Sequence, residues 1–197
     1  EEICAATILS KNCDKKHIIF ITKQGIFKKS LLDEYNVKRA GGAKAIELAP
    51  NDEIVSVIFT NEDPIGVLTA EGNLLLTTTS DIRAIGRVAK GVKGIKLNEG
   101  DYVVSAKVLP KDTKEILSIT RKGLSKRTGF DEFGFTGKNT KGKKVQKITD
   151  GDLMADFLAI ENEPEVLVVS STAQLKVSTL EISSLGRGAQ GSKTIKL

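Results

Sequence analysis

The stretch that decides the fold is GRVAKGVKGIKL at residues 86–97, because the chain contains four copies of it that align without a gap. The other copies are VKRAGGAKAIEL (37–48), GKNTKGKKVQKI (137–148) and GRGAQGSKTIKL (186–197). Each copy has a glycine at its sixth position, and these are spaced 49, 51 and 49 residues apart, at Gly42, Gly91, Gly142 and Gly191. A period of this length is typical of propellers and other repeat arrays.

Between these closing motifs, the four repeats share a second plan of strand, polar turn, strand, tight turn and strand. The clearest copy is IVSVIFTNEDPIGVLTAEGNLLLTT at 54–78, and related segments begin at Ile3, Val103 and Met154. Three of the tight turns read TKQG, TAEG and TRKG, and each ends on a glycine that can take a positive φ. The fourth has degenerated to Thr172, Ala173 and Gln174. The pattern predicts a β-hairpin around each tight turn.

The strands themselves are short and rich in β-branched residues, as in HIIFIT (17–22) and EVLVVSS (165–171), and no segment shows a helical apolar stripe. Only 31–35, 81–85 and 180–185 are predicted to form a helical turn. We therefore expect an all-β fold, a propeller-like β-pinwheel of four-stranded blades. The chain is predicted to be one domain over 1–197, with blade repeats at about 1–52, 53–101, 102–152 and 153–197.

Composition sets limits on the class of protein. The chain has 197 residues, 40% of them hydrophobic, and a net charge of +5 with a pI near 9.1, so an acidic partner is plausible. It contains no apolar run of membrane-spanning length and no signal-peptide pattern, which predicts a soluble, cytoplasmic protein without a membrane partner. Because it begins at Glu1 without a methionine and stops within a motif, we expect a fragment of a longer protein.

The residues that usually carry catalysis are scarce. Cys4 and Cys13 match no metal-ligand spacing, and His17 is the only histidine, so we expect it simply to begin a strand. Tyr35 and Tyr102 are expected to lie in a turn and at a strand start, without a metal-binding acidic cluster or an arginine arranged beside them, and therefore to have a packing role. The chain also lacks a phosphate-binding loop. These observations predict no catalytic site, no metal site and no cofactor.

The closing motifs place cations at two fixed positions. The second residue of each copy is basic, and so is the eighth: Lys38, Arg87, Lys138 and Arg187, then Lys44, Lys93, Lys144 and Lys193. A purely structural interpretation holds that the glycines turn the chain and the lysines keep the loops soluble. Four copies favour a second interpretation, in which the loops lie at one level of a radial array and their cations form a belt that follows a phosphate backbone.

These residues resemble a known family. GRVAKGVKGIKLNEGD (86–101), GIFKKSLLDEY (25–35) and GLSKRTGFDEF (123–133) are similar to the repeating units of the carboxy-terminal domains of the A subunits of DNA gyrase and topoisomerase IV, the bacterial type IIA topoisomerases. The resemblance spans essentially the whole chain and implies a β-pinwheel whose basic rim binds and bends duplex DNA. Carried over by position, the DNA-binding candidates are Lys28, Lys29, Lys38, Arg39, Lys44, Arg87, Lys90, Lys93, Lys126, Arg127, Lys138, Lys141, Lys143, Lys144, Arg187 and Lys193.

The same resemblance implies partners. The parent would be an ATP-dependent type IIA topoisomerase, an isomerase, and the domain would work beside the catalytic core of its own polypeptide and an ATPase-bearing B-type subunit in the bacterial cytoplasm, at the nucleoid. Gyrase domains usually have six blades and a box close to QRRGGKG, whereas this chain has four repeats and only KRAGGAK (38–44) and GRGAQGSK (186–193). These departures favour topoisomerase IV over a gyrase-type wrapping domain. Leu75 and Leu76 replace the basic pair in the second repeat, which argues against DNA contact by that particular strand.

Charge also differs between repeats. Residues 102–152 hold 12 Lys and Arg against 6 Asp and Glu, whereas residues 53–101 hold 5 against 7, so the third repeat should dominate an interaction with DNA. Because lysines contact phosphates and not base edges, we expect binding that depends little on sequence. The alternative is a propeller whose rim binds an acidic protein, although 5% aromatic residues and no tryptophan disfavour it. An enzyme ranks last.

Overall fold

The computed structural model describes residues 14–36, 42–163 and 165–194. In these ranges the chain forms β-strands and four short 3-10 turns, and the predicted all-β fold is confirmed. The strands are β1 (His17–Thr22), β2 (Ile26–Leu31), β3 (Ile54–Thr60), β4 (Pro64–Thr69), β5 (Asn73–Thr78), β6 (Val92–Lys93), β7 (Val103–Val108), β8 (Glu115–Thr120), β9 (Leu124–Gly129), β10 (Lys143–Lys144), β11 (Met154–Ile160), β12 (Glu165–Val169), β13 (Gln174–Ser178) and β14 (Ser192–Lys193). The 3-10 turns are η1 (Leu32–Tyr35), η2 (Thr79–Asp81), η3 (Phe130–Glu132) and η4 (Thr179–Glu181).

The tight turns form hairpins, as the sequence predicts. Antiparallel pairs join β1 to β2, β4 to β5, β8 to β9 and β12 to β13. Gly25, Gly72 and Gly123 have φ of +79°, +85° and +82°, which explains why glycine ends the first three turns. His17 begins β1, also as expected.

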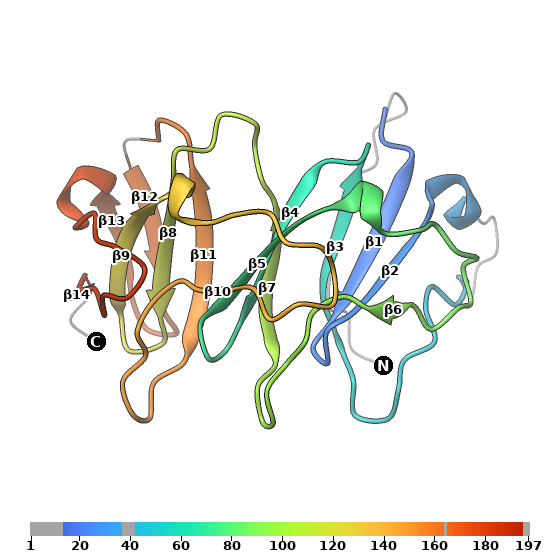
Figure 1. Ribbon diagram of the computed structural model, residues 1–197, viewed down its shortest axis with the longest axis horizontal. Coiled ribbons are helices and arrows are strands. Elements are labelled where there is room, and N and C mark those ends of the chain that lie inside the picture. Colours follow the sequence, from blue (N-terminus) through green and yellow to red (C-terminus); the bar gives the residue numbers. More distant parts are fainter. Residues whose placement is uncertain (1–13, 37–41, 164, 195–197) are drawn as a thin grey trace.

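The sheets are assembled from neighbouring repeats. Their strand orders are β3-β1-β2-β6, β10-β5-β4-β7 and β11-β8-β9-β14, followed by the two-stranded pair β12-β13. In each four-stranded sheet, the central hairpin comes from one repeat, while the first strand and the closing strand come from a later one. The two strands that flank each polar turn, such as β3 and β4, therefore belong to different sheets. Figure 1 shows the sheets side by side along the longest axis, with β1 and β2 at one end and β12 and β13 at the other.

The core contains three apolar clusters between successive sheets, and a fourth cluster forms around Ile18, Phe20 and Ile46 in the first repeat. Ile19 of the first sheet packs with Val67 of the second, Leu68 of the second with Phe157 of the third, and Leu117 of the third with Val166 of β12. The inner strands are thus buried on both faces, which explains their nearly continuous apolar sequence. Each such side chain contributes about 1.5–3 kcal/mol when fully buried.

Candidate nucleic-acid interface

The closing motifs occupy equivalent places on the three four-stranded sheets. β6, β10 and β14 pair with β2, β5 and β9, and the register sets Lys93 opposite Ile26, Lys144 opposite Asn73 and Lys193 opposite Leu124. All three lysines are exposed. Figure 1 shows the three short strands in a row across the molecule, so the eighth-position cations recur at one structural position in successive blades.

The shared glycine of the closing motif is needed because the segment approaches the preceding hairpin closely. Gly91 and Gly191 have φ of +93° and +87°. A Cβ on Gly91 would lie 2.8 Å from the carbonyl oxygen of Phe27, and one on Gly191 would lie 2.6 Å from that of Ser125. Gly142 lies in the same way against the Leu74 carbonyl. Backbone geometry alone therefore accounts for these glycines, as the structural interpretation holds.

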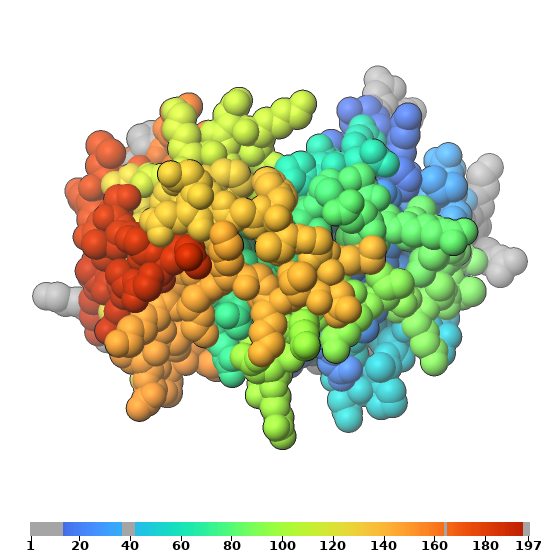
Figure 2. Space-filling model, in the orientation of Figure 1, coloured from blue at the N-terminus to red at the C-terminus, as the bar shows by residue number. Residues whose placement is uncertain are grey.

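Backbone hydrogen bonds join each closing segment to the next. Glu47 N donates to Ala89 O at 3.4 Å, Lys96 N to Thr140 O at 2.9 Å, and Lys147 N to Ala189 O at 3.1 Å. We call residues 42–48, 86–97, 137–148 and 186–194 together the closing belt. Figure 2 shows three of these segments, in green, orange and red, covering one face of the molecule. The belt therefore carries its cations on a single hydrogen-bonded track.

Acidic residues that sequence reasoning missed position the second residue of the motif. The backbone N–H of Arg87 donates to Glu34 Oε2 at 2.8 Å, and that of Arg187 donates to Glu132 Oε2 at 3.0 Å. The signal was present in the sequence, because both glutamates follow an aspartate at the same point after a hairpin, in LLDEY and GFDEF. These carboxylates fix the loop, and Glu132 also forms an ion pair with the half-buried Arg187 side chain at 3.9 Å.

The third segment presents a concentrated group of exposed lysines. Lys138 Nζ donates to the Asp81 carbonyl at 2.6 Å, Lys141 Nζ to Asn98 Oδ1 at 2.5 Å, and Lys144 Nζ to the Glu71 carbonyl at 2.6 Å. An ammonium has three donors, so each of these groups keeps hydrogen-bonding capacity after its internal bond. All three internal bonds tie the third segment to the second repeat.

The basic pairs of β2 and β9 are not on the surface, which corrects the expectation that they form part of an exposed rim. Lys28 is fully buried, and its Nζ donates to Ser30 Oγ, Tyr35 OH and Ala45 O at 2.7–2.8 Å. Lys126 is also fully buried and donates to Gly186 O at 2.8 Å. Burial lowers the pKa of both ammonium groups, that of Lys126 to about 8.

Their neighbours in these pairs are enclosed as well. Lys29 is 3% exposed and donates to Thr79 O at 2.9 Å, and Arg127 forms an ion pair with Glu115 and donates to Ile182 O at 2.9 Å. The physical reason is that β2 and β9 are inner strands, between a hairpin partner and a closing strand. These four side chains anchor the turns and loops that lie over them, and they drop out of the candidate interface.

The remaining candidates lie on the belt. Lys90 forms an ion pair with Glu47 at 3.5 Å, and Lys143 is half-buried like Arg87 and Arg187. Lys38 and Arg39 lie outside the described residues. The candidates that the structure exposes are Lys44, Lys90, Lys93, Lys138, Lys141, Lys144 and Lys193.

In the described part of the chain, no cluster of three His, Cys, Asp or Glu side chains could hold a metal ion, and no helix is long and apolar enough to cross a membrane. Tyr35 packs on Phe20 with ring centroids 5.5 Å apart, as its expected packing role requires. Cys4 and Cys13 lie outside the described residues.

Comparison with known proteins identifies relatives. The family model described as "DNA gyrase C-terminal domain, beta-propeller" matches four successive segments, residues 16–61, 67–110, 114–161 and 165–197. The A subunit of DNA gyrase from Staphylococcus epidermidis is 34% identical over 189 residues, which cover 93% of this chain and 21% of that protein. The chain thus spans about a fifth of the length of this relative.

Two solved structures share the fold. The C-terminal domain of DNA topoisomerase IV superposes with a TM-score of 0.87 at 22% identity, covering 95% of this chain and 60% of that one. The DNA gyrase A C-terminal domain superposes with a TM-score of 0.84 at 23% identity, covering 95% and 64%. At these identities the likeness establishes the fold, and the propeller-like repeat architecture predicted from the sequence is confirmed.

Proposed function

Because the chain belongs to the family of DNA gyrase C-terminal β-propeller domains, we propose that it is a non-catalytic module that binds duplex DNA and bends it along the closing belt. The observation that carries the proposal is the recurrence of exposed lysines at one register position, on loops joined to one another by backbone hydrogen bonds. Phosphates are spaced regularly along a duplex, so a rigid, regular row of cations suits them better than scattered charge does.

Electrostatic attraction between the closing belt and the DNA phosphates can supply the free energy that bending the duplex costs. Smooth bending of a site of about 20–30 base pairs costs on the order of 1–6 kcal/mol. Neutralising about four to eight phosphates releases their counterions, which favours binding and makes it dependent on salt. Because the belt exposes mainly lysines, the module should bind many sequences and favour those that bend easily.

The first test measures duplex binding by fluorescence anisotropy at several salt concentrations. The logarithm of affinity should fall against the logarithm of salt with a slope of about −4 to −7. Duplexes of about 15, 25 and 40 base pairs should bind with increasing affinity until the belt is filled, and end-labelled donor and acceptor dyes should move closer on binding. A slope near zero, or binding to one sequence alone, would reject the proposal.

The second test asks whether the belt, and not overall charge, binds the DNA. The belt variant replaces three exposed lysines of the third segment by alanine, and the matched control replaces three exposed lysines elsewhere, with the same change of net charge. The belt variant changes Lys138, Lys141 and Lys144, and the control changes Lys111, Lys114 and Lys176. We expect the belt variant to flatten the salt slope by up to about three units and the control to change it little. Equal losses would show that overall charge is sufficient.

A comparison within the belt tests the ranking of the repeats. Replacing Arg87, Lys90 and Lys93 in the second segment should weaken binding less than the third-segment variant does. The reason is that Lys90 is paired with Glu47 and Arg87 is half-buried beside Glu34, so fewer of these charges are available to phosphates. The opposite order would show that loop geometry, and not charge density, positions the duplex.

The parent enzyme and its partners form part of the proposal. We propose a bacterial type IIA topoisomerase, in which the module acts in the cytoplasm, at the nucleoid, with the catalytic core of its own polypeptide and an ATPase-bearing B-type subunit. Four repeats and the incomplete QRRGGKG box favour topoisomerase IV, whereas the curated relatives at 30–34% identity are gyrase A subunits. Ligation of a nicked circle in the presence of the domain distinguishes them, because a wrapping domain changes the linking number and a bending domain leaves it nearly unchanged.

A further inference from the structure

One exposed aromatic ring lies just before the third closing segment. Phe135 is 54% exposed, whereas every other aromatic side chain of the described residues is buried or half-buried. It stands two residues before the closing motif that begins at Gly137, and three before Lys138. Covering such a ring in a contact with another molecule would be favourable, because it removes a large apolar surface from water.

The other blades have small side chains at the position of Phe135. Counted back from the closing motif, this position holds Ala84 in the second segment and Ser184 in the fourth. The structure places them alike, because Ala84 forms a bridge with Lys29 of β2 and Ser184 one with Arg127 of β9. The residue after Phe135 likewise donates its backbone N–H to β5, at 2.9 Å. The repeat architecture therefore does not require a large aromatic side chain here.

The surroundings of this position on the second blade are apolar, whereas on the third blade they are charged. On the third blade, Ser184 Oγ donates to Glu115 Oε1 at 2.9 Å, and Glu115 also forms the ion pair with Arg127. On the second blade, Pro64 begins β4 where Glu115 begins β8, and Leu76 takes the place of Arg127. An apolar group thus replaces the whole polar cluster, not one residue of it.

A hollow of about 380 Å³ lies beside the ring. It is lined by Pro64, Thr78, Asp81, Phe135, Thr136 and Gly137. Lys138 brings a positive charge to it, because its Nζ donates to the carbonyl of Asp81 at 2.6 Å. Asp81 is itself exposed, and its negative charge disfavours a phosphate directly over the hollow. The hollow therefore suits the uncharged bases and sugars of a nucleic acid, with phosphates further along the lysine-rich segment.

The exposed ring has firm support. Phe130 of η3 packs against it edge to face, with ring centroids 6.2 Å apart and an interplanar angle of 76°. The backbone after it is tied to β5 through Thr136 N and to the second closing segment through Thr140 O, which accepts from Lys96 N at 2.9 Å. A ring that is already held in place loses little conformational freedom when it makes a contact.

We propose that Phe135 is a wedge, which inserts its ring partly between two stacked base pairs of a duplex on the closing belt and so determines where the duplex bends. The inference rests on the proposed function, because it requires DNA on the belt. Apolar side chains inserted in this way unstack a base step and kink the duplex by about 20–90°. The exposed Lys138, Lys141 and Lys144 follow in the same segment and supply cations for the phosphates beside the kink. Figure 2 shows this stretch, in yellow and orange, on the face that the closing segments cover.

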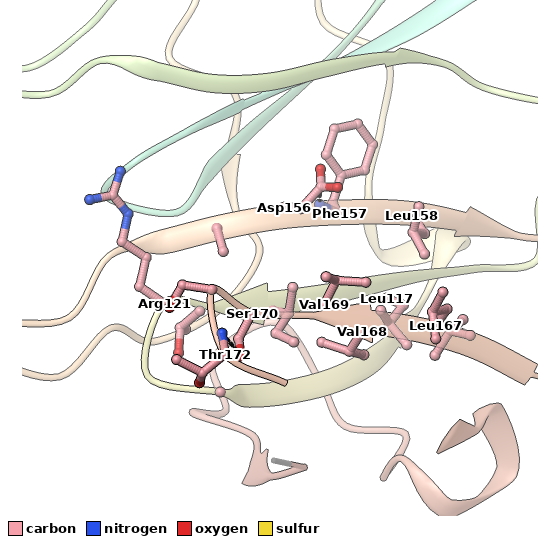
Figure 3. Close-up of a pocket in the computed structure, with 16 residues that line it drawn as sticks. Leu117, Arg121, Asp156, Phe157, Leu158, Leu167, Val168, Val169, Ser170 and Thr172 are labelled. Atoms are coloured by element: carbon pink, nitrogen blue, oxygen red, sulfur yellow. Dashed lines mark hydrogen bonds between the residues drawn. The ribbon is translucent and has the colours of Figure 1, made fainter. Parts of the chain in front are cut away.

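The first test uses a fluorescent reporter. The chain contains no tryptophan, so Phe135→Trp gives it a single indole at the proposed point of contact. Leu167→Trp is the matched control, because Leu167 is 61% exposed on β12. Figure 3 shows Leu167 among residues of β8, β11 and β12, none of which belongs to the closing belt. A duplex of about 25 base pairs should quench the fluorescence of Phe135→Trp, because stacked bases quench indole, and should leave that of Leu167→Trp unchanged.

The second test removes the wedge. Phe135→Ser gives the third segment the side chain that the fourth carries at this position, and Phe135→Leu keeps an apolar wedge. Affinity for the duplex should fall about fivefold or more in Phe135→Ser, and end-labelled dyes should approach each other less, while Phe135→Leu should retain most of the bending. The salt slope should stay that of the parent, because no phosphate contact is lost. Leu167→Ser is the control and should behave like the parent.

Base sequence supplies a third readout, which a purely structural role for Phe135 would not affect. The parent should bind a duplex with a central TA step more tightly than one with an uninterrupted A-tract, since TA steps unstack easily and A-tracts are stiff. Phe135→Ser should lose this preference.

The outcomes separate the wedge from the proposed function. A parent chain that does not bind duplex DNA would reject both. Salt-dependent binding by the parent, with an unquenched Phe135→Trp or with full bending by Phe135→Ser, would overturn the wedge alone, and the exposed ring would then suit a contact with another protein. A flattened salt slope in Phe135→Ser would also overturn it, because the substitution would have displaced the lysines.

Discussion

Replacing the buried Lys126 by methionine should make the stability of the protein less dependent on alkaline pH. Lys126 lies in β9 without exposed surface, and burial lowers its pKa from 10.5 to about 8. The folded state therefore binds fewer protons than the unfolded state between pH 8 and pH 10.5, and stability rises with pH across this window. Below pH 8 the ammonium is charged in both states, and the whole cost of burying the charge is present.

The magnitude follows from the two pKa values. With a folded pKa of about 8 and an unfolded pKa near 10.5, raising the pH from 7 to 9.5 stabilises the parent protein by about 2 kcal/mol through this group alone. Methionine has a similar length and no charge, so the variant lacks this contribution. The free energy of unfolding of the parent minus that of Lys126→Met should therefore increase by about 2 kcal/mol over the same pH range.

Urea unfolding followed by circular dichroism at both pH values measures the difference, and the subtraction removes titrations that the two proteins share, including that of Lys28. A difference that does not change with pH would refute the reasoning, because it would mean that the ammonium reaches solvent in the native state. DNA binding at pH 7 should be affected only through the loop that Lys126 anchors at Gly186.

Two further changes test the geometry of the belt and its supports. Gly142→Ala should destabilise the fold by at least about 1 kcal/mol, because φ is +73° and the new Cβ would meet the Leu74 carbonyl, whereas Gly137→Ala has no close neighbour and should cost little in thermal unfolding. Asp101→Ala removes an acceptor for two backbone N–H groups, at 2.9 and 3.0 Å, and should cost about 1–3 kcal/mol in urea unfolding. The exposed Asp112→Ala is its control, and an equal loss there would contradict this explanation.

Much of the architecture could be predicted because it is periodic in the sequence. The aligned glycines located the closing segments, and the tight-turn glycines located the hairpins. The pairing of β3 with β1 could not be predicted, because identical repeats do not indicate whether a strand pairs within its own repeat or with the one before. The strand segments were thus identifiable, and their distribution among sheets was not.

The candidate site was predictable only in part, for a related reason. Motif alignment gives the sign of a side chain's charge but not its exposure. Exposed lysines and buried lysines both recur at fixed positions of the repeat. Lys144 lies on a short closing strand and is exposed, whereas Lys28 lies on an inner strand and is covered. The backbone carbonyls that accept hydrogen bonds from Lys28 and Lys126 belong to loops distant in sequence. The sequence around each lysine therefore does not predict that the side chain is buried.

The sharing of strands between repeats has a consequence for how such arrays can lengthen. A duplicated unit of about 50 residues does not bring a complete sheet with it. It extends the sheet before it and leaves its own hairpin to be completed by the unit that follows. Duplication or deletion of a repeat in the gene can therefore lengthen or shorten the array without a new kind of contact between repeats. Every repeat contributes the same two strands to the sheet of the repeat before it. This sharing of strands should make the fold more cooperative than a simple stack, since no sheet can unfold without withdrawing strands from the repeat beside it.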